Sequence, residues 1–388
     1  MTDRAGADRL REVPPIGVDA MGARADAAAN PDILRLENLD TDLRPPAAAL
    51  TATHAAIEDD DANSYLPFLG QAALRSAVAE RLLVSTGRAY DPEQEVIITA
   101  GGLNGCMVTL NALLNPGDEV VVTDPTYIGM LNRIRIAGGV PVQVPFRYGE
   151  GRWALDLDRL EAAVGERTRA LFIMSPSMPS GAVLDAAAWN AIAGLCERYD
   201  LWLIYNAAME RILYDGLPCL HPASLPTLHE RTITVGSASK EYRMIGWRVG
   251  WVVGPASIMR ELGLVSISDV VVPVGIAQQA AAAALRGDQG DVTAAVATWE
   301  GRRDLILAEL EGFQLRRPSG SWSMLLDAGA LGLSGAEASA RLFDRGDVAA
   351  TAMDNWGKTH GSQYLRLVFS NEPLERLAGI GERFRRSF

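Results

Sequence analysis

Segment 237–250, SASKEYRMIGWRVG, carries a lysine and an arginine at a spacing that could do chemistry. Lys240 directly follows a β-rich run, and Arg248 lies eight residues later between two glycines. A lysine amine that is held at a fixed point and can lose its proton is able to form a Schiff base with a carbonyl group. A guanidinium binds an anionic phosphate through two parallel hydrogen bonds. Taken alone, however, a surface lysine and arginine after a strand would give the same short pattern.

The segment resembles the lysine signature of the class I and II aminotransferases, which is written S-x-[SAG]-K and is followed by G-W-R-x-G. The resemblance extends over nearly the whole chain, with motifs in matching order. It implies pyridoxal 5'-phosphate (PLP) as cofactor, carried by Lys240 as a Schiff base. It also implies a PLP-dependent aminotransferase, in which Lys240 moves protons while an amino group passes between an L-α-amino acid and a 2-oxo acid.

Other positions match residues with which this family binds its cofactor. The resemblance assigns the phosphate to Gly101, Gly102, Leu103, Ser237, Ser239 and Arg248. The glycine loop would open a helix whose N-terminus favours an anion. Tyr127, in DPTYIG, would stack on the pyridine ring, although an ordinary buried tyrosine would fit the same motif. Tyr65, in NSYLPFLG, matches a tyrosine that reaches the phosphate of a neighbouring subunit, and so the resemblance implies a homodimer.

Two further segments concern the substrate. Arg366, in YLRLVFS, matches the arginine that binds the substrate α-carboxylate, whereas a lone arginine in this strand would be read as a surface charge. Leu39 and Tyr127 are the other expected substrate contacts. Leu39 and Asp40, in LENLDTDLRPP, stand where the family has a glycine and an apolar residue. This departure leaves the identity of the amino acid open.

Three cofactor positions depart from the family pattern. The loop written N-P-x-N-P-x-G stands here as SPSMPSG, so Met178 replaces the asparagine that hydrogen-bonds the cofactor's phenolic oxygen. The strand end written D-x-x-Y stands as NAAM. Asn206 therefore replaces the aspartate that keeps a proton on the pyridine nitrogen, and Met209 replaces the tyrosine that shares the phenolic oxygen.

These replacements weaken the expected electron sink. A carboxylate facing the ring nitrogen stabilises the pyridinium, whereas the neutral Asn206 can only hydrogen-bond the nitrogen. A hydrogen bond to a charged group is worth ~1.5–3 kcal/mol, against ~0.5–1.5 kcal/mol for a neutral one. Loss of ~2 kcal/mol of carbanion stabilisation slows that step more than ~10-fold. Either nearby groups such as Tyr242 or Ser177 compensate, or the chemistry is less demanding or has been lost.

Two alternatives to transamination therefore stay open. The same lysine could serve a PLP-dependent elimination, replacement or cyclisation in amino-acid-derived metabolism, which would need no 2-oxo acid. The altered positions would also fit a degenerate, non-catalytic PLP-fold protein, although Lys240 and Arg366 are both present.

The elements that must position these residues alternate between strands and helices. Helical spacing over residues 71–83 precedes short apolar runs without alternation, which are typical of strands buried on both faces of a parallel sheet. We expect an α/β protein with a mostly parallel, seven-stranded-type sheet flanked by helices (PLP-dependent transferase fold type I) and a smaller α+β domain. The strand-like runs are residues 95–100, 119–124, 170–175, 201–206 and 232–238. The expected divisions are an N-terminal arm at 1–47 that packs with the small domain, a large PLP-binding domain at 48–285 and a small domain at 286–388.

The composition of the chain limits the kinds of molecule that we expect it to bind. The net charge of −12, without a basic block, argues against nucleic acid. The three cysteines and four histidines lack metal-ligand spacing, and a sparse, odd cysteine count favours a reducing compartment. The N-terminus is too charged for a signal peptide, and no apolar run is long enough for a membrane span. We therefore expect a cytoplasmic protein with no metal and no membrane contact.

Overall fold

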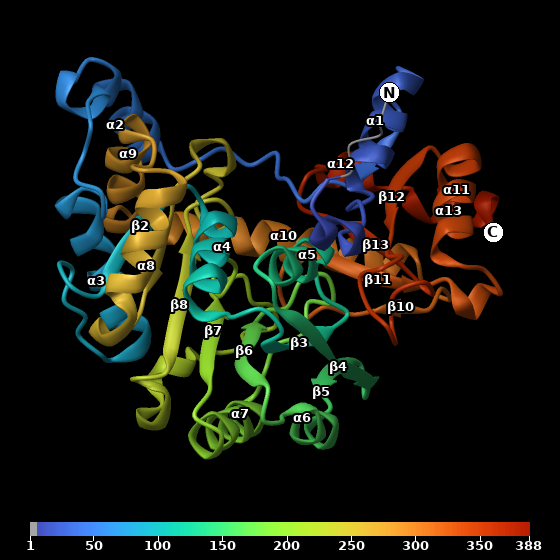
Figure 1. Ribbon diagram of the computed structural model, residues 1–388. Helices are drawn as coiled ribbons and strands as arrows, with labels where there is room; N and C mark the ends of the chain where they lie inside the picture. Colours follow the sequence, from blue (N-terminus) through green and yellow to red (C-terminus); the bar gives the residue numbers. More distant parts are fainter. Residues whose placement is uncertain (1–5) are drawn as a thin grey trace, which may run out of the picture.

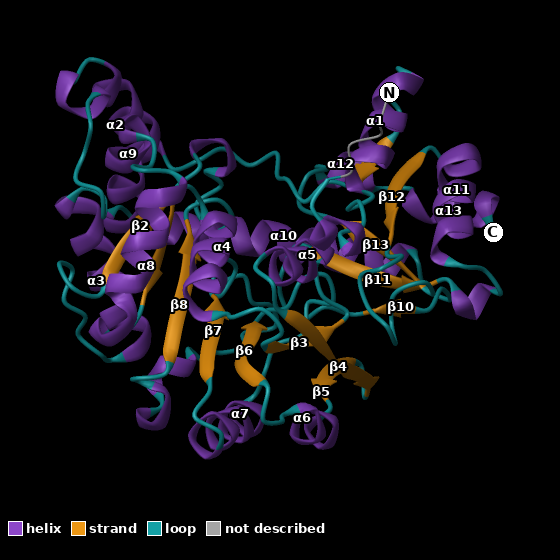
Figure 2. Ribbon diagram, viewed as in Figure 1, coloured by secondary structure: helices purple, strands orange, loops and turns teal. Residues whose placement is uncertain are grey.

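Two β-sheets lie side by side in the computed structural model, which describes residues 6–388, and helices cover both (Figures 1 and 2). The larger sheet has eight strands in the order β2-β9-β8-β7-β6-β3-β4-β5. Its strands are β2 (Val96–Thr99), β3 (Glu119–Asp124), β4 (Val140–Gly149), β5 (Arg152–Leu155), β6 (Thr168–Met174), β7 (Trp202–Asn206), β8 (Thr232–Ser237) and β9 (Gly250–Val253).

The centre of the large sheet is parallel. Strands β4, β3, β6, β7 and β8 pair in parallel, whereas β9 is antiparallel to both β8 and β2. Strands β3, β7 and β8 are mostly apolar and almost wholly buried because helices cover both faces of the sheet, whereas β4, next to the edge strand, is only partly buried. The sequence predicts a seven-stranded sheet, and the eighth strand, β5, is added at the edge by an antiparallel pairing with β4.

Helices α2 to α9 pack around the large sheet, and α10 runs from this half of the molecule to the other (Figure 1). The α-helices of the described residues are α1 (Val18–Ala28), α2 (Ala47–Ile57), α3 (Ala72–Thr86), α4 (Gly102–Leu113), α5 (Ile128–Ile136), α6 (Leu157–Ala163), α7 (Ala186–Arg198), α8 (Ala256–Asp269), α9 (Gly275–Arg286), α10 (Gly290–Glu309), α11 (Gly335–Gly346), α12 (Leu374–Leu377) and α13 (Ile380–Ser387). No helix within residues 6–388 combines the length and the apolar character needed to cross a membrane.

The smaller sheet joins the two ends of the described chain. Its order is β1-β12-β13-β11-β10. Its strands are β1 (Leu34–Leu36), β10 (Leu315–Arg316), β11 (Ser323–Asp327), β12 (Val348–Ala352) and β13 (Tyr364–Val368). Strand β1 pairs in parallel with β12, so the segment before α2 is a structural part of the C-terminal half.

The N-terminal segment is more ordered than its sequence indicates. The pattern of residues 1–47 shows no sustained periodicity, yet α1 and β1 form within it. Helix α1 has one buried residue, Ala25, because it lies on the surface of the small sheet and contributes little to the core. A weakly amphipathic surface helix of this kind leaves little trace in the hydrophobic pattern. Residues 1–5 of the expected arm lie outside the described residues.

Candidate active site

A cavity of about 320 Å³ opens between the two halves of the molecule. Its walls come from the carboxyl ends of central strands β3, β6, β7 and β8, the start of α4, the N-terminal segment and β13. Ligand sites of open α/β sheets lie at this edge because the loops that follow parallel strands converge there. Of the expected site residues, the cavity is lined by Leu39, Gly102, Leu103, Tyr127, Met178, Asn206, Met209, Ser237, Ser239, Lys240, Arg248 and Arg366.

Lys240 lies just beyond the end of β8, and its amine is enclosed in the cavity. The Nζ atom donates a hydrogen bond to the Leu39 carbonyl oxygen at 2.7 Å and lies 4.8 Å from the centre of the Trp322 ring. Burial lowers the pKa of Lys240 to about 8, and the nearby Arg366 and Arg248 charges act in the same direction. About a tenth of this amine is therefore neutral, and so nucleophilic, at pH 7. The chain has one other lysine, the exposed Lys358.

Arg248 lies at one end of the cavity, which we call the glycine–arginine end (Gly101, Gly102, Ser237, Ser239 and Arg248). Its backbone is left-handed, with φ of 55°, and its Nη1 atom donates to the Ile245 carbonyl oxygen at 2.9 Å. A Cβ atom on Gly101 would lie 2.5 Å from Arg248 Nη2, and one on Gly102 would lie 3.2 Å from Ser237 Cβ. Gly101 therefore leaves room for the guanidinium, and Gly102 leaves room for Ser237, beside the first turn of α4.

The same end presents several donors to an anion. Ser237 Oγ donates to Ser239 Oγ at 2.9 Å, and Ser239 Oγ also accepts a long hydrogen bond from Arg248 Nη1 at 3.5 Å. Gly102 begins α4, a helix of 12 residues whose first backbone N–H groups have no partner within the helix. A guanidinium, two hydroxyls and a helix N-terminus together make a site suited to a phosphate. Gly101 itself does not line the cavity and acts through the space that it leaves for Arg248.

Arg366 lies on β13 with its side chain buried against the opposite wall of the cavity. Its Nη2 atom donates to the Glu37 carbonyl oxygen and to Thr351 Oγ1, while its Nε atom is buried and has no partner within residues 6–388. The guanidinium carbon lies 4.9 Å from the centre of the Trp356 ring. Burial lowers the pKa of Arg366 to about 10, so it stays charged at neutral pH. A carboxylate in the cavity would satisfy the unpartnered donor.

The third part of the cavity, the methionine–asparagine edge, consists of Met178, Asn206 and Met209. Asn206 ends β7, and its Oδ1 atom accepts a hydrogen bond from the Ala208 backbone N–H at 3.1 Å. A backbone N–H can only donate, and this contact therefore assigns the oxygen and leaves the amide nitrogen free within the described residues. Met209 Sδ accepts from Ser321 Oγ at 3.4 Å, and Met178 Sδ lies 3.8 Å from Arg366 Nη1.

Neither compensating group considered from the sequence reaches this edge. Tyr242 is absent from the cavity lining, and its hydroxyl donates to Gln289 Oε1 at 3.0 Å. Ser177 is buried beside Met178 but is also absent from the lining, and its hydroxyl has no partner among the described residues. The cavity therefore presents one amide where the resemblance implies a partner of the pyridine nitrogen, and two thioethers where it implies hydrogen-bonding partners of the phenolic oxygen.

Tyr65 lies outside the cavity of its own chain, with 84% of its surface exposed. The structure also adds residues that the sequence analysis did not identify. Trp356 packs edge to face with Tyr127 at 5.4 Å between ring centres, and Trp322 faces Lys240. Ile16, Val18 and Asp19 line the cavity from the N-terminal segment. The sequence around these three residues contains no motif that indicates a functional site, and only the fold brings them to the cavity.

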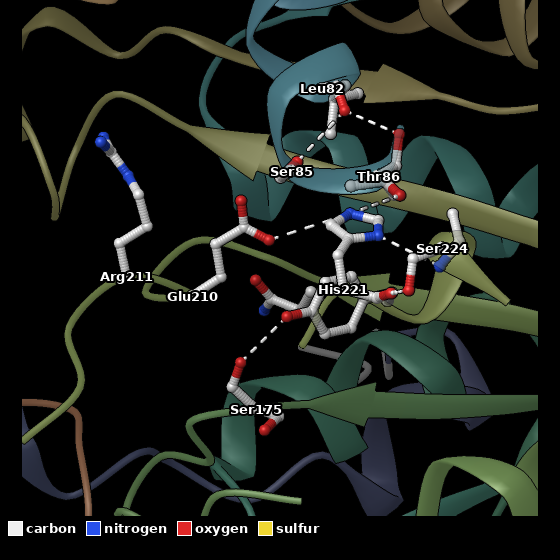
Figure 3. A network of polar contacts seen from close by, with 12 residues as sticks. Leu82, Ser85, Thr86, Ser175, Glu210, Arg211, His221 and Ser224 are labelled. Carbon is white, nitrogen blue, oxygen red and sulfur yellow. Dashed lines mark hydrogen bonds and ion pairs between the residues drawn. The ribbon is translucent and has the colours of Figure 1, made fainter. Parts of the chain in front are cut away.

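A buried polar network includes His221, Glu210 and Ser175 (Figure 3). Tyr205, a residue of β7, donates its hydroxyl to the Ser175 carbonyl oxygen at 3.0 Å and packs on the His221 ring. His221 Nδ1 accepts from the Ala223 backbone N–H, so the proton of the neutral ring is on Nε2, which lies 3.8 Å from Glu210 Oε2. Burial lowers the pKa of His221 to about 3, whereas burial and the Glu241 charge raise the pKa of Glu210 to about 8. Both groups are therefore mostly neutral at pH 7.

Comparison with known proteins gives consistent matches over most of the chain. Residues 34–380 match the family model "Aminotransferase class I and II". The chain is 36% identical over 347 residues to an arginine–pyruvate transaminase of Pseudomonas aeruginosa, a match that covers 88% of this chain and 87% of that protein. It is 32% identical over 385 residues to an aspartate/prephenate aminotransferase of Thermus thermophilus, with 97% of each chain covered.

Solved structures agree with the sequence matches. N-succinyldiaminopimelate aminotransferase from Mycobacterium tuberculosis aligns with a TM-score of 0.93 at 30% identity, covering 99% of this chain and 100% of that one. Aspartate aminotransferase from Thermus thermophilus, solved with maleate, aligns with a TM-score of 0.91 at 30% identity and the same coverage. The similarity thus extends over both sheets and the cavity between them.

Proposed function

The chain belongs to the class I and II aminotransferases, and from this premise we propose that its cavity binds PLP through Lys240, with a methionine–asparagine edge that weakens the electron sink. The protein is a PLP-dependent aminotransferase of fold type I that transfers an amino group between an amino acid and a 2-oxo acid. The observation that carries the site assignment is the position of the Lys240 amine in the cavity, between the glycine–arginine end, which is suited to a phosphate, and the buried Arg366.

The residues of the cavity fit the cofactor. The glycine–arginine end offers the phosphate a guanidinium, hydroxyls and a helix N-terminus, with Gly101 and Gly102 leaving the space. The Tyr127 side chain lines the cavity, where it would stack on the ring. When bound, PLP supplies an aldehyde that bonds to an amine and a conjugated ring that withdraws electrons from the substrate α-carbon.

Lys240 supplies the proton transfers. Its neutral amine takes the proton from the α-carbon of the amino acid and returns a proton in the reverse half of the cycle. Because burial holds its pKa near 8, the amine can act as base or acid close to neutral pH. Arg366 fixes the substrate by its α-carboxylate, with the unpartnered Nε available for this contact.

Asn206 sets the character of the ring nitrogen. Its oxygen is engaged by the Ala208 N–H, and its free amide N–H group therefore favours a ring nitrogen that carries no proton. Met178 and Met209 offer the phenolic oxygen no donor. The ring is thus held in place but withdraws electrons less strongly than it would opposite a carboxylate.

Four broader assignments belong to the same proposal. The amino donor is an L-α-amino acid, and the protein works in the cytoplasm as a homodimer in which the exposed Tyr65 reaches the phosphate in its partner's cavity. The divisions at 1–47, 48–285 and 286–388 are supported by β1 in the small sheet and by the end of α9 at Arg286.

Because the sequence contains two lysines, the attachment of PLP to Lys240 can be tested directly. The protein is incubated with PLP, reduced with borohydride and weighed by mass spectrometry. Wild type and Lys358→Ala should each gain one covalently bound cofactor, and Lys240→Ala should gain none. A cofactor found on Lys358, or on neither lysine, contradicts the site assignment.

The reaction itself is tested with a panel of L-amino acids and 2-oxo acids. We expect a new 2-oxo acid and a new amino acid in equal amounts, with activity lost in Lys240→Ala and kept in Lys358→Ala. Release of ammonia without a 2-oxo acid acceptor would instead show an elimination.

A further inference from the structure

The N-terminal segment closes one side of the cavity and is fixed there by hydrogen bonds. Asn132 Nδ2 donates to the Pro14 carbonyl oxygen at 2.9 Å, and Trp356 Nε1 donates to the Ile16 carbonyl oxygen at 3.3 Å. The Trp356 ring also packs against Arg366 and Tyr127. Residues that follow Ile16 are therefore held at a defined place relative to the groups that would bind the substrate.

Asp19, in the first turn of α1, is the one acidic residue among the described residues that line the cavity. The three basic residues, Lys240, Arg248 and Arg366, each have a role in binding cofactor or α-carboxylate. Asp19 has no hydrogen-bond or ion-pair partner among residues 6–388. Its charge is close to Tyr127, where burial raises the pKa of the phenol and Asp19 adds a smaller increase.

The cavity wall around Asp19 is mostly apolar. Besides Asp19, the lining residues from the N-terminal segment and from α5 are Ile16, Val18, Asn38, Leu39 and Met130, of which only Asn38 is polar. An apolar wall with one carboxylate suits a side chain with a methylene stem and a cationic end, because the stem can be buried while the end meets the opposite charge. An acidic substrate side chain would face the Asp19 charge.

We propose that Asp19 is a specificity-determining residue that favours amino donors whose side chains end in a cation, a guanidinium or an ammonium group. This inference rests on the proposed function of the cavity and names the class of donor that it takes. Asp19 acts on the far end of the substrate side chain, away from the bonds that change.

A purely structural role for Asp19 makes a different prediction. A carboxylate in the first turn stabilises a helix through the helix dipole. Loss of that stabilisation would loosen the N-terminal segment and lower the activity with all donors alike. The ratio between a cationic and a neutral donor of similar length separates the two roles.

The test compares kcat/KM for L-arginine, L-lysine, L-norleucine and L-glutamate in the holoenzyme. The variants are Asp19→Asn, which removes the charge at nearly constant shape, Asp19→Lys, and the control Asp26→Asn on the same helix, whose side chain pairs with Arg35. Calorimetric binding of 5-guanidinopentanoate and hexanoate, which have no α-amino group, gives a second measurement that needs no turnover.

We expect Asp19→Asn to lower the preference for arginine over norleucine about fivefold, with a matching loss of 5-guanidinopentanoate affinity. Asp19→Lys should improve glutamate relative to arginine, and Asp26→Asn should leave the ratios unchanged. An unchanged ratio in Asp19→Asn, or an equal loss for every donor, overturns the inference while the aminotransferase assignment stands. If no donor reacts with the wild type, the proposed function fails, and the binding comparison alone decides for or against Asp19.

Discussion

The two parts of the cavity that would meet the cofactor differ in how many polar partners they provide. The glycine–arginine end combines a guanidinium, two hydroxyls and a helix N-terminus, which lie close together because Gly101 and Gly102 have no side chains. The methionine–asparagine edge provides one free amide group and two thioethers. The glycine–arginine end is therefore suited to binding an anion, whereas the methionine–asparagine edge would present only uncharged groups to the cofactor ring.

This difference separates anchoring from electronic tuning. The phosphate would fix the position of the cofactor whether or not the edge that faces the ring is polar, because its hydrogen bonds involve a full charge. The power of the ring to withdraw electrons depends on groups at the other edge. Under the proposed assignment, the protein keeps the residues that would hold the cofactor, Lys240 and Arg248, and differs from the family pattern in those that would set the speed of the chemical step.

The largest expected effect concerns the glycine–arginine end. Arg248→Ala should weaken PLP binding about thirty- to hundredfold, because it removes charge-assisted hydrogen bonds to the phosphate worth about 2–3 kcal/mol. Equilibrium titration followed by absorbance measures the Kd. The exposed Arg260→Ala serves as control. An unchanged Kd in folded Arg248→Ala would mean that the phosphate binds elsewhere.

The methionine–asparagine edge should respond in the opposite direction. Asn206→Asp should raise the rate of amino-group transfer by more than about tenfold, since a carboxylate adds about 2 kcal/mol of stabilisation at the ring nitrogen. Single-turnover kinetics with a saturating donor measure the rate. Nuclear magnetic resonance of ¹⁵N-labelled PLP should show an unprotonated ring nitrogen in the wild type and a protonated one in the variant. A protonated nitrogen in the wild type would contradict the orientation inferred for Asn206.

The capture of PLP by the apoprotein should depend on pH at Lys240. With the pKa lowered to about 8, about a tenth of the amine is neutral at pH 7 and about nine tenths at pH 9. The capture rate should therefore rise about tenfold between these values, as measured by stopped-flow absorbance. Lys358→Ala should show the same profile, and a rise centred near pH 10.5 would mean that the amine is not desolvated.

The smallest effect is expected from the buried polar network that includes Glu210. The pKa of Glu210 is about 8 in the folded chain and near 4.5 when unfolded. Its contribution to stability is thus fully present below about pH 4.5 and is lost as the pH rises through about 8. The side chain at position 210 cannot ionise in Glu210→Gln. The melting temperature of this variant, relative to that of the wild type, should therefore increase by about 2–4 °C as the pH is raised from 5 to 9. The exposed Glu230→Gln should show no such gain, and a constant difference for Glu210→Gln would contradict a neutral Glu210.

Much of the site could be predicted because local motifs carry it. The runs at 95–100, 119–124 and 232–238 contain strands β2, β3 and β8, since an unbroken apolar run is the pattern of a strand buried on both faces. Lys240 and Arg248, which both line the cavity, could be predicted to lie close together because they follow β8 at a short spacing. Helix α1 and strand β5 were missed because each lies at a surface or an edge, where the hydrophobic pattern is weak.

The sequence by itself determined the type of sheet, the candidate cofactor lysine Lys240 and the departures from the family pattern at Met178, Asn206 and Met209, because each lies in a continuous segment. Only the tertiary structure decided that Tyr242 and Ser177 stay out of the cavity, that the Asn206 oxygen is engaged by a backbone N–H, and that Asp19 lines the wall. The reason is physical. Hydrogen-bond partners, burial and charge neighbours depend on which distant segments pack together, and no spacing along the chain records that.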